Sequence, residues 1–326
     1  MHLSVAAGNI AAMNDIRTTP PRPLDVAALF PQLAPLARPA IRLHPRPGSP
    51  SPNDSSVGGP LLWPADEPWP RCDESHDQMD DLYDAYEVRA SEDCEWHDGP
   101  NPLVPVTQLY VRDIPLLRPP GKADLLQVLW CPFEHEPDYK PPTALFWRSS
   151  AEVTDILAVP PGPFAVEYDG YIPRPCVLAP EQITEYPNPM DVSKELQQQL
   201  GDWGNWQAAG SAVDSSWAPY PDSFYDRHLS VAPGWKVGGW PPWGLTDPIA
   251  RFCTACGAKM APLLTIASDE WDSSNTGWAP HEDQHLAALH RADGANPPEI
   301  QVSKGNHLQL YVCPESPDHP HTTLIQ

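Results

Sequence analysis

Cysteine and histidine residues in the last quarter of the chain are spaced like the ligands of a structural metal site. Cys253 and Cys256 form a Cys-x-x-Cys-Gly knuckle, and Cys313 follows 57 residues later. Two thiolates at this spacing can meet one tetrahedral ion, and the glycine permits the tight turn. With His319 as the fourth ligand this set would bind zinc, and His321 is the alternative to His319. A redox pair competes with this interpretation, but the following proline and the β-like run LLTIA oppose the helix that such a pair would begin.

A second candidate site lies earlier in the chain, in two Cys-x3-His pairs. Its four candidate ligands are Cys72, His76, Cys131 and His135. Two cysteines and two histidines satisfy zinc, although this spacing is less typical than that of the knuckle. Buried thiols beside solvent-facing histidines are the alternative. Cys94 and His97 compete for the same role, whereas Cys176 has no partner pattern and is expected in the core.

The two candidate sites belong to an internal duplication. The segments LQVLWCP (126–132) and LQLYVCP (308–314) are identical at four of seven positions, with an offset of 182. Other landmarks recur in the same order at offsets of 180 and 181: Gly58 and Gly59 with Gly238 and Gly239, and Cys72 with Cys253. A stretch rich in Pro and Trp follows each glycine pair, where glycine allows a positive φ and close backbone approach. We therefore predict two related halves with equivalent metal sites.

The elements that must position these residues are mostly short strands. The chain holds 45 Pro and 19 Gly among 326 residues, which excludes a helical bundle because an interior proline breaks a helix. Short apolar runs predict strands at 125–130, 144–147, 155–159, 263–267 and 308–312. One helix is predicted over 191–203, capped by Asp191 or Ser193, and a short or broken one after Asp25. The predicted fold is mainly β (α+β).

Four regions follow from this pattern. They are a flexible leader (1–23), a first half (24–165) with an acidic insert (73–98), a connector with one helix (166–224), and a second half (225–326). The insert holds 11 acids and one base, which predicts a solvated loop, or alternatively an arm that engages a basic partner.

Charge narrows the classes of function. The chain has 20 Lys+Arg against 43 Asp+Glu, a formal net charge of −23. Such a surface repels phosphate backbones and anionic lipid, so no nucleic-acid or membrane partner is expected. A basic protein partner, or simply solubility, fits better. No apolar span of about 20 residues and no signal-peptide pattern is visible, so we expect a cytoplasmic protein with reduced thiols.

Enzyme motifs are absent from the sequence. It contains no phosphate-binding glycine loop, no Gly-x-Ser-x-Gly and no His-Glu-x-x-His. The acids Asp269, Glu270 and Asp272 could supply acid–base chemistry, but they follow a strand directly, so a turn with solvated acids is expected. The competing class is a metal-dependent hydrolase, which needs one zinc with only three protein ligands.

Several of these segments resemble a known family. The run DSSVGGP (54–60) with its Trp-Pro pairs, PVTQLYVRDIP (105–115) and DLLQVLWCP (124–132) look like the signature of the YwqG-like bacterial proteins of unknown function. KVGGWPPWG, CTACG and the final LQLYVCP are similar to the C-terminal domain of the programmed cell death protein 2 family, which includes chaperones of a ribosomal protein. The resemblance implies a duplicated, mainly β fold without established enzymatic activity.

The sequence thus predicts a non-catalytic, zinc-stabilised protein-binding module with a basic partner and a chaperone- or immunity-like role. The expected recognition surface is a groove between the halves, lined by Trp235, Trp240 and Trp243 beside acidic loops. Aromatic and acidic side chains together suit a basic segment with apolar anchors.

Overall fold

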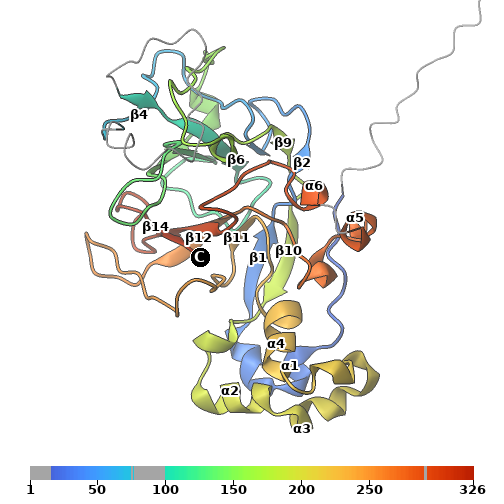
Figure 1. Ribbon diagram of the computed structural model, residues 1–326. Coiled ribbons are helices and arrows are strands. Elements are labelled where there is room, and N and C mark those ends of the chain that lie inside the picture. The colour runs from blue at the N-terminus through green and yellow to red at the C-terminus, as the bar shows by residue number, and fades with distance from the viewer. Residues whose placement is uncertain (1–15, 75, 77–99, 290–291) are drawn as a thin grey trace, which may run out of the picture.

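Two β-sheets dominate the protein. The computed structural model describes residues 16–74, 76, 100–289 and 292–326 (Figure 1). Within this part of the chain, fourteen strands form two six-stranded sheets and one two-stranded sheet, and the helices are short. This confirms the predicted mainly β fold.

The sheets are antiparallel at each strand pair that is described. The first six-stranded sheet has the order β2 (Arg46–Pro47), β9 (Cys176–Val177), β3 (Ser56–Val57), β6 (Val104–Tyr110), β7 (Leu125–Trp130) and β8 (Thr143–Arg148). The second has the order β10 (Glu181–Glu185), β1 (Arg38–Arg42), β11 (Lys236–Gly238), β12 (Ala261–Ala267), β13 (His307–Val312) and β14 (Thr322–Ile325). The small sheet pairs β4 (Arg71–Cys72) with β5 (Asn101–Pro102).

The two large sheets are built alike. The order β3-β6-β7-β8 in one matches β11-β12-β13-β14 in the other, and β6 and β12 each carry a register irregularity after a proline-containing start. Gln127 on β7 donates from Nε2 to the Leu62 carbonyl at 3.0 Å, and Gln309 on β13 donates from Nε2 to the Pro242 carbonyl at 2.5 Å. Both carbonyls lie in the Pro/Trp stretch that follows the glycine pair. The recurring glutamine therefore holds this stretch against its sheet in each half. This hydrogen bond accounts for a buried polar side chain in an otherwise apolar strand.

The two sheets share the segments that supply their outer strands. The segment with β1 and β2 and the segment with β9 and β10 each place one strand in each sheet, since β1 pairs with β11 whereas β9 pairs with β3. Strand β1, from the predicted first half, thus completes the sheet of the second half. Strands β9 and β10, from the predicted connector, add one strand to each sheet. The two sheets are consequently tied together by the backbone itself.

One apolar core lies between the two large sheets. It joins Val57 and Leu126 from the first sheet with Val237, Ile266 and Leu308 from the second, all at most 2% exposed. A shared core of this kind means that the two halves stabilise each other by burying the same apolar surface.

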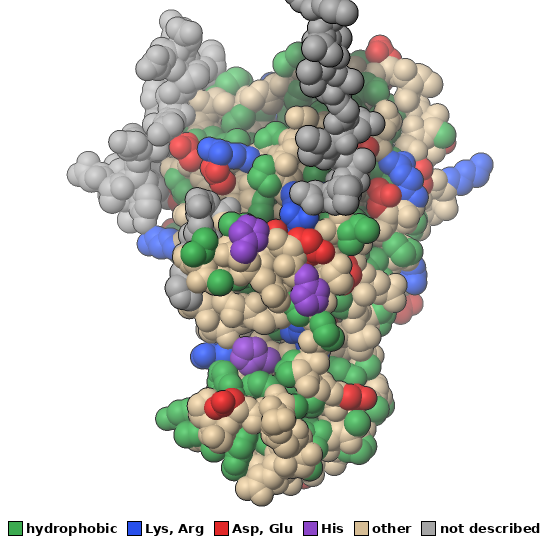
Figure 2. Space-filling view, turned by 90° about the vertical axis from the view of Figure 1, so that its right-hand side faces the viewer, with side chains coloured by type: hydrophobic (Ala, Val, Ile, Leu, Met, Phe, Trp, Pro, Cys, Tyr) green, Lys and Arg blue, Asp and Glu red, His purple; other side chains and the backbone are tan. Residues whose placement is uncertain are grey.

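A helical lobe lies at one end of the sheets. It contains α1 (Val26–Leu29), α2 (Lys194–Gly201), α3 (Trp203–Trp206) and α4 (Pro221–Tyr225), which surround their own apolar cluster (Figure 1). Ser193 caps α2 by accepting a hydrogen bond from the Leu196 amide, so the predicted helix and one of its two predicted caps are confirmed. Figure 2 shows from the side that this lobe is narrower than the body of sheets above it.

One local expectation, a predicted strand, needs correction. The run 155–159 forms no strand, because only Ile156 makes an isolated bridge, to Pro64. Residues 16–23, the described part of the predicted flexible leader, make specific contacts: Arg17 pairs with Asp283 at 2.7 Å, and the Arg22 guanidinium lies over the Trp278 ring at 3.6 Å.

Most of the acidic insert, with Cys94 and His97, lies outside the described residues. Two small helices, α5 (Gln284–Ala288) and α6 (Ala292–Ala295), follow β12.

Candidate metal centres

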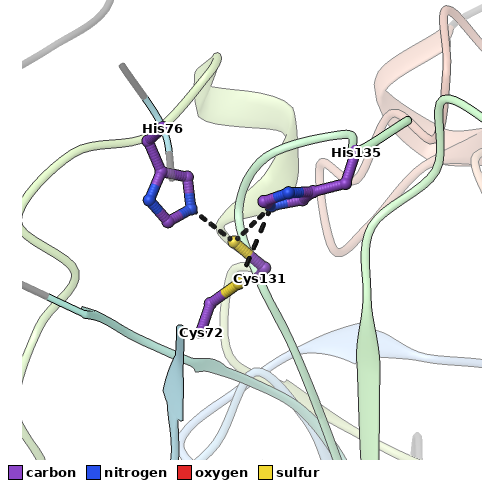
Figure 3. Close-up of side chains that lie close together, drawn as sticks. All are labelled: Cys72, His76, Cys131 and His135. Carbon is purple, nitrogen blue, oxygen red and sulfur yellow. Dashed lines mark hydrogen bonds between the residues drawn. The ribbon is translucent and has the colours of Figure 1, made fainter. Parts of the chain in front are cut away.

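The first centre brings together the four ligands predicted for the first half. Cys72 ends β4, Cys131 directly follows β7, and His135 lies just beyond it, with His76 on the chain that leaves β4 (Figure 3). The four ligand atoms lie within 4.8 Å of one another. The packing of Cys72 and Cys131 in an apolar cluster explains why these strand ends stay fixed. The prediction that these four residues meet is confirmed.

The distances in the first centre fit a tetrahedral ion. The Nε2 atoms of His76 and His135 each lie 3.3 Å from the Cys131 sulfur, and the Cys72 sulfur is 3.7 Å from the His135 Nε2. Around a zinc ion with ordinary bond lengths, neighbouring ligand atoms are about 3.5–3.8 Å apart. A small contraction or expansion of the cluster therefore places all four donors on one ion.

A carboxylate outside the first centre orients one of its histidines. Glu74 accepts a hydrogen bond from Nδ1 of His135 at 2.8 Å, which leaves Nε2 directed at the sulfur atoms. Metal-binding histidines commonly have such a partner, because it fixes the tautomer and raises the basicity of the ligand nitrogen. The sequence reasoning missed Glu74; its signal was an acid between the two ligands Cys72 and His76.

The second centre contains the knuckle and the residues after β13. The Cys253 amide donates to the Ala258 carbonyl at 2.8 Å and the Gly257 amide to the Cys253 carbonyl at 2.8 Å, so the loop between the first two cysteines closes tightly. Gly257 has a φ of +74°, a conformation that favours glycine. His319 Nδ1 lies 3.5 Å from the Cys253 sulfur and 3.3 Å from that of Cys313.

The remaining ligand of the second centre is the more exposed one. The Cys256 sulfur lies 3.5 Å from that of Cys313, and all four ligand atoms lie within 4.8 Å. Cys256 is exposed, whereas Cys253 and Cys313 are buried. His321 does not join them, since its Nε2 lies 2.8 Å from the Thr143 hydroxyl on β8. The structure thus selects His319 over His321.

Both centres favour thiolates, the form that binds metal. The hydrogen bond with Cys131, aided by His135 and His76, lowers the pKa of Cys72, and the same contact and burial raise the pKa of Cys131. Burial acts to raise the pKa of Cys313, but hydrogen bonds from His319 and from backbone amides outweigh it and lower that pKa to about 6. In each centre one cysteine, Cys72 or Cys313, therefore loses its proton more readily than an ordinary thiol.

The predicted tryptophan surface needs correction. Trp235 is 1% exposed and belongs to the core between the sheets, so it cannot meet a partner. Trp240 donates from its indole nitrogen to the Leu36 carbonyl at 2.9 Å, and Trp243 donates to Asp191 at 2.6 Å. These indoles connect the second sheet to the helical lobe, because their polar N–H groups find partners within the chain.

Two further predicted sites have clear outcomes. Cys176 is buried and belongs to neither cluster, as expected for a core thiol. Glu270, in contrast, is no solvated turn residue: it is 2% exposed and accepts a hydrogen bond from the Trp235 amide at 2.8 Å.

The glycine turns lie where predicted, with φ of +62° at Gly58 and +73° at Gly238. A Cβ at Gly58 would approach the Pro173 carbonyl to 2.6 Å.

Comparisons with known proteins add no family to this picture. No protein-family model matches the chain, and no curated protein matches it significantly. Among the described residues, no helix has both the length and the apolar character needed to cross a membrane. The two Cys/His centres are consequently the strongest guide to function.

Proposed function

We propose that this protein is a non-catalytic, cytoplasmic protein-binding module whose two halves are each stabilised by one zinc ion. The observation that supports it best is the pair of four-ligand Cys/His clusters at equivalent ends of the two sheets. The ligands in each cluster come from segments far apart in sequence, 72–76 with 131–135 and 253–256 with 313–319. An ion there would fasten the Pro/Trp stretch to the end of its sheet, as structural zinc does in small folds.

The ligand count supports a structural role and not hydrolysis. A catalytic zinc keeps an open coordination position for water, usually with three protein ligands. Here each cluster supplies four donors from the protein, two or three of them cysteine sulfurs. The apolar residues packed against Cys72 and Cys131 also limit access of a substrate to the first centre.

A basic protein is the partner that we propose. Eleven of the 43 acidic residues fall within 73–98, and this segment begins at the first centre, next to Cys72. A zinc ion held by Cys72 and His76 would fix the start of this segment. A chaperone- or immunity-like role, in which an acidic protein covers a basic one, fits this arrangement.

The test combines metal analysis with a binding assay. Protein purified without added metal or a histidine tag should contain two zinc ions per chain by elemental analysis, and the zinc-loaded protein should enrich basic proteins in a pull-down. A matched control deletes residues 78–98 and keeps Cys72, Glu74 and His76, so it should retain both ions and lose most of the enrichment. Equal recovery of basic proteins by both forms, or none by either, would contradict the proposed partner.

A further inference from the structure

A small cavity away from the metal centres combines apolar walls with buried charged groups. Its volume is about 210 Å³, and it lies between the chain crossing from β1 to β2 and the helices α5 and α6. This is smaller than the roughly 300–1,000 Å³ of sites for drug-sized ligands. The cavity therefore suits a single side chain or a ligand of that size.

Two of the residues that line this cavity carry a buried polar atom that has no hydrogen-bond partner among the described residues. These atoms are Nδ1 of His44 and Oε2 of Glu270, which lie 3.7 Å apart. His44 is 3% exposed and Glu270 is 2% exposed. The buried Arg42 forms an ion pair with this oxygen, but its guanidinium nitrogen is also 3.7 Å away, beyond hydrogen-bond distance. Buried polar atoms in proteins are otherwise nearly always hydrogen-bonded.

The neighbours of these two side chains show which ligand they can accept. Nε2 of His44 lies 3.1 Å from the Glu181 carboxylate, and a carboxylate only accepts, so Nε2 carries a proton. In the neutral ring Nδ1 is then an acceptor. The free oxygen of Glu270 is an acceptor as well. The carboxylate of Glu270, with His44 3.7 Å away as a second acceptor when its ring is neutral, matches a donor group with several N–H bonds.

The backbone holds both groups in place. His44 has a φ of 44°, the left-handed conformation that residues other than glycine seldom adopt. The Glu270 carboxylate is held by the Trp235 amide at 2.8 Å and lies against Gly234, where a Cβ would approach Oε2 to 2.7 Å. Only glycine leaves room for the carboxylate in this position.

The rest of the cavity wall suits an alkyl chain. Its apolar part is formed by prolines, a tryptophan and a leucine: Pro45, Pro47, Trp271, Pro280, Leu286 and Pro297. Three charged side chains besides Glu270 also line the cavity: Arg17, Arg46 and Asp283. Arg17 pairs with Asp283 at 2.7 Å. Apolar residues beside a buried carboxylate suit an alkyl chain with a charged amine at its tip.

We propose that this cavity binds a primary alkylammonium group through Glu270 and His44. The source is either a lysine side chain of a basic protein or a free amine of similar length. Binding of a lysine side chain rests on the proposed function, because that lysine would anchor the basic partner. Binding of a free amine does not depend on the proposed function.

The test measures binding of small probes to the full-length, zinc-loaded protein. In calorimetric or NMR titrations, n-butylammonium and Nα-acetyl-lysine amide should bind, whereas n-butanol and Nε-acetylated lysine amide should bind at least about tenfold more weakly. The isosteric E270Q substitution should reduce ammonium binding by a similar factor. Its control is E299Q, which removes an exposed carboxylate that pairs with Arg174 at 2.5 Å outside the cavity. A second variant, L286F, keeps the carboxylate but fills the cavity, and it should also abolish binding.

Each outcome bears on one of the two proposals. Equal binding of n-butanol and n-butylammonium, or preferential binding of n-butyrate, would overturn the ammonium site. Ammonium binding that persists in E270Q and L286F would overturn it too. If n-butylammonium binds and the pull-down finds no basic partner, the cavity is a free-amine site and the proposed function fails. If the pull-down succeeds and no amine binds, the partner is held elsewhere and the cavity proposal fails.

Discussion

Cys131 and Cys313 occupy the same position in the two halves, each one residue beyond the end of the strand that lies third from its glycine turn, β7 and β13. Each lies 3.3 Å from a histidine that follows it within six residues, His135 and His319. The equivalence extends to the partner loops, where Cys72 corresponds to Cys253 and His76 to Cys256. The two centres are therefore variants of one site, with a histidine in the first at the position of an exposed cysteine in the second.

Removing one of these cysteines should remove one zinc ion and leave the other. We expect C131S and C313S each to bind one zinc per chain, because the two clusters share no ligand, and each to unfold at a lower temperature. C176S is the matched control: this thiol is buried but belongs to neither cluster, so C176S should retain both ions. Elemental analysis with thermal unfolding measures both effects. Loss of both ions from either variant would show that the centres depend on each other.

The choice between His319 and His321 can be tested directly. H319A should lose the second zinc, whereas H321A should keep both ions and lose only its hydrogen bond with Thr143, at a cost of about 1 kcal/mol in unfolding free energy. The readouts are zinc content and denaturant unfolding. A zinc-deficient H321A with an intact H319A would reverse the assignment.

Glu74 should tune the first centre without being a ligand. E74Q weakens the hydrogen bond to Nδ1 of His135, so zinc affinity should fall by about 10–100-fold while the ion count at saturating zinc stays at two. Competition with a chelating dye measures the affinity. The exposed neighbour Asp73 is the control, and D73N should leave the affinity unchanged; an equal decrease in both variants would indicate a general effect of charge.

The sequence predicted the centres better than the buried charges, for a physical reason. Metal ligands left a local signature, since Cys72 and Cys131 recur as Cys253 and Cys313 at offsets of 181 and 182, and the second pair adds a Cys-x-x-Cys knuckle. The burial of Glu270 left none, because its contacts with the Trp235 amide and His44 join segments that only the fold brings together. The pairing of β1 with β11 was equally invisible, because strands of two to five residues carry little periodicity. Trp235 was misplaced on a surface because the sequence does not tell which side of a sheet a tryptophan covers.

A buried ion pair next to the second glycine turn should be sensitive to loss of one partner. Lys236 donates to Glu185 at 2.6 Å, both side chains are fully buried, and the other Glu185 oxygen accepts from the Trp240 amide at 2.8 Å. E185Q would leave a buried ammonium without its counter-ion, so we expect a loss of about 3–5 kcal/mol in unfolding free energy. D138N, which breaks the exposed pair with Lys140, should change it by less than about 1 kcal/mol. Denaturant unfolding measures the loss of unfolding free energy in each variant. Similar losses in E185Q and D138N would contradict the claim that burial makes the Lys236–Glu185 pair sensitive.

Acid should destabilise the protein partly through His307. Burial, with Lys236 nearby, lowers the pKa of this histidine from 6.5 to about 4. Between these values the unfolded chain therefore binds up to one more proton than the folded chain. The contribution of His307 to the unfolding free energy is complete above pH 6.5 and is lost as the pH falls toward 4. The loss attributable to this group is up to about 3 kcal/mol. Because acid also releases zinc, the informative quantity is the difference between the wild type and H307F, measured by thermal unfolding at each pH. The wild type should lose stability faster than H307F over this range, and parallel curves would show that His307 is protonated in the folded protein as readily as in the unfolded chain.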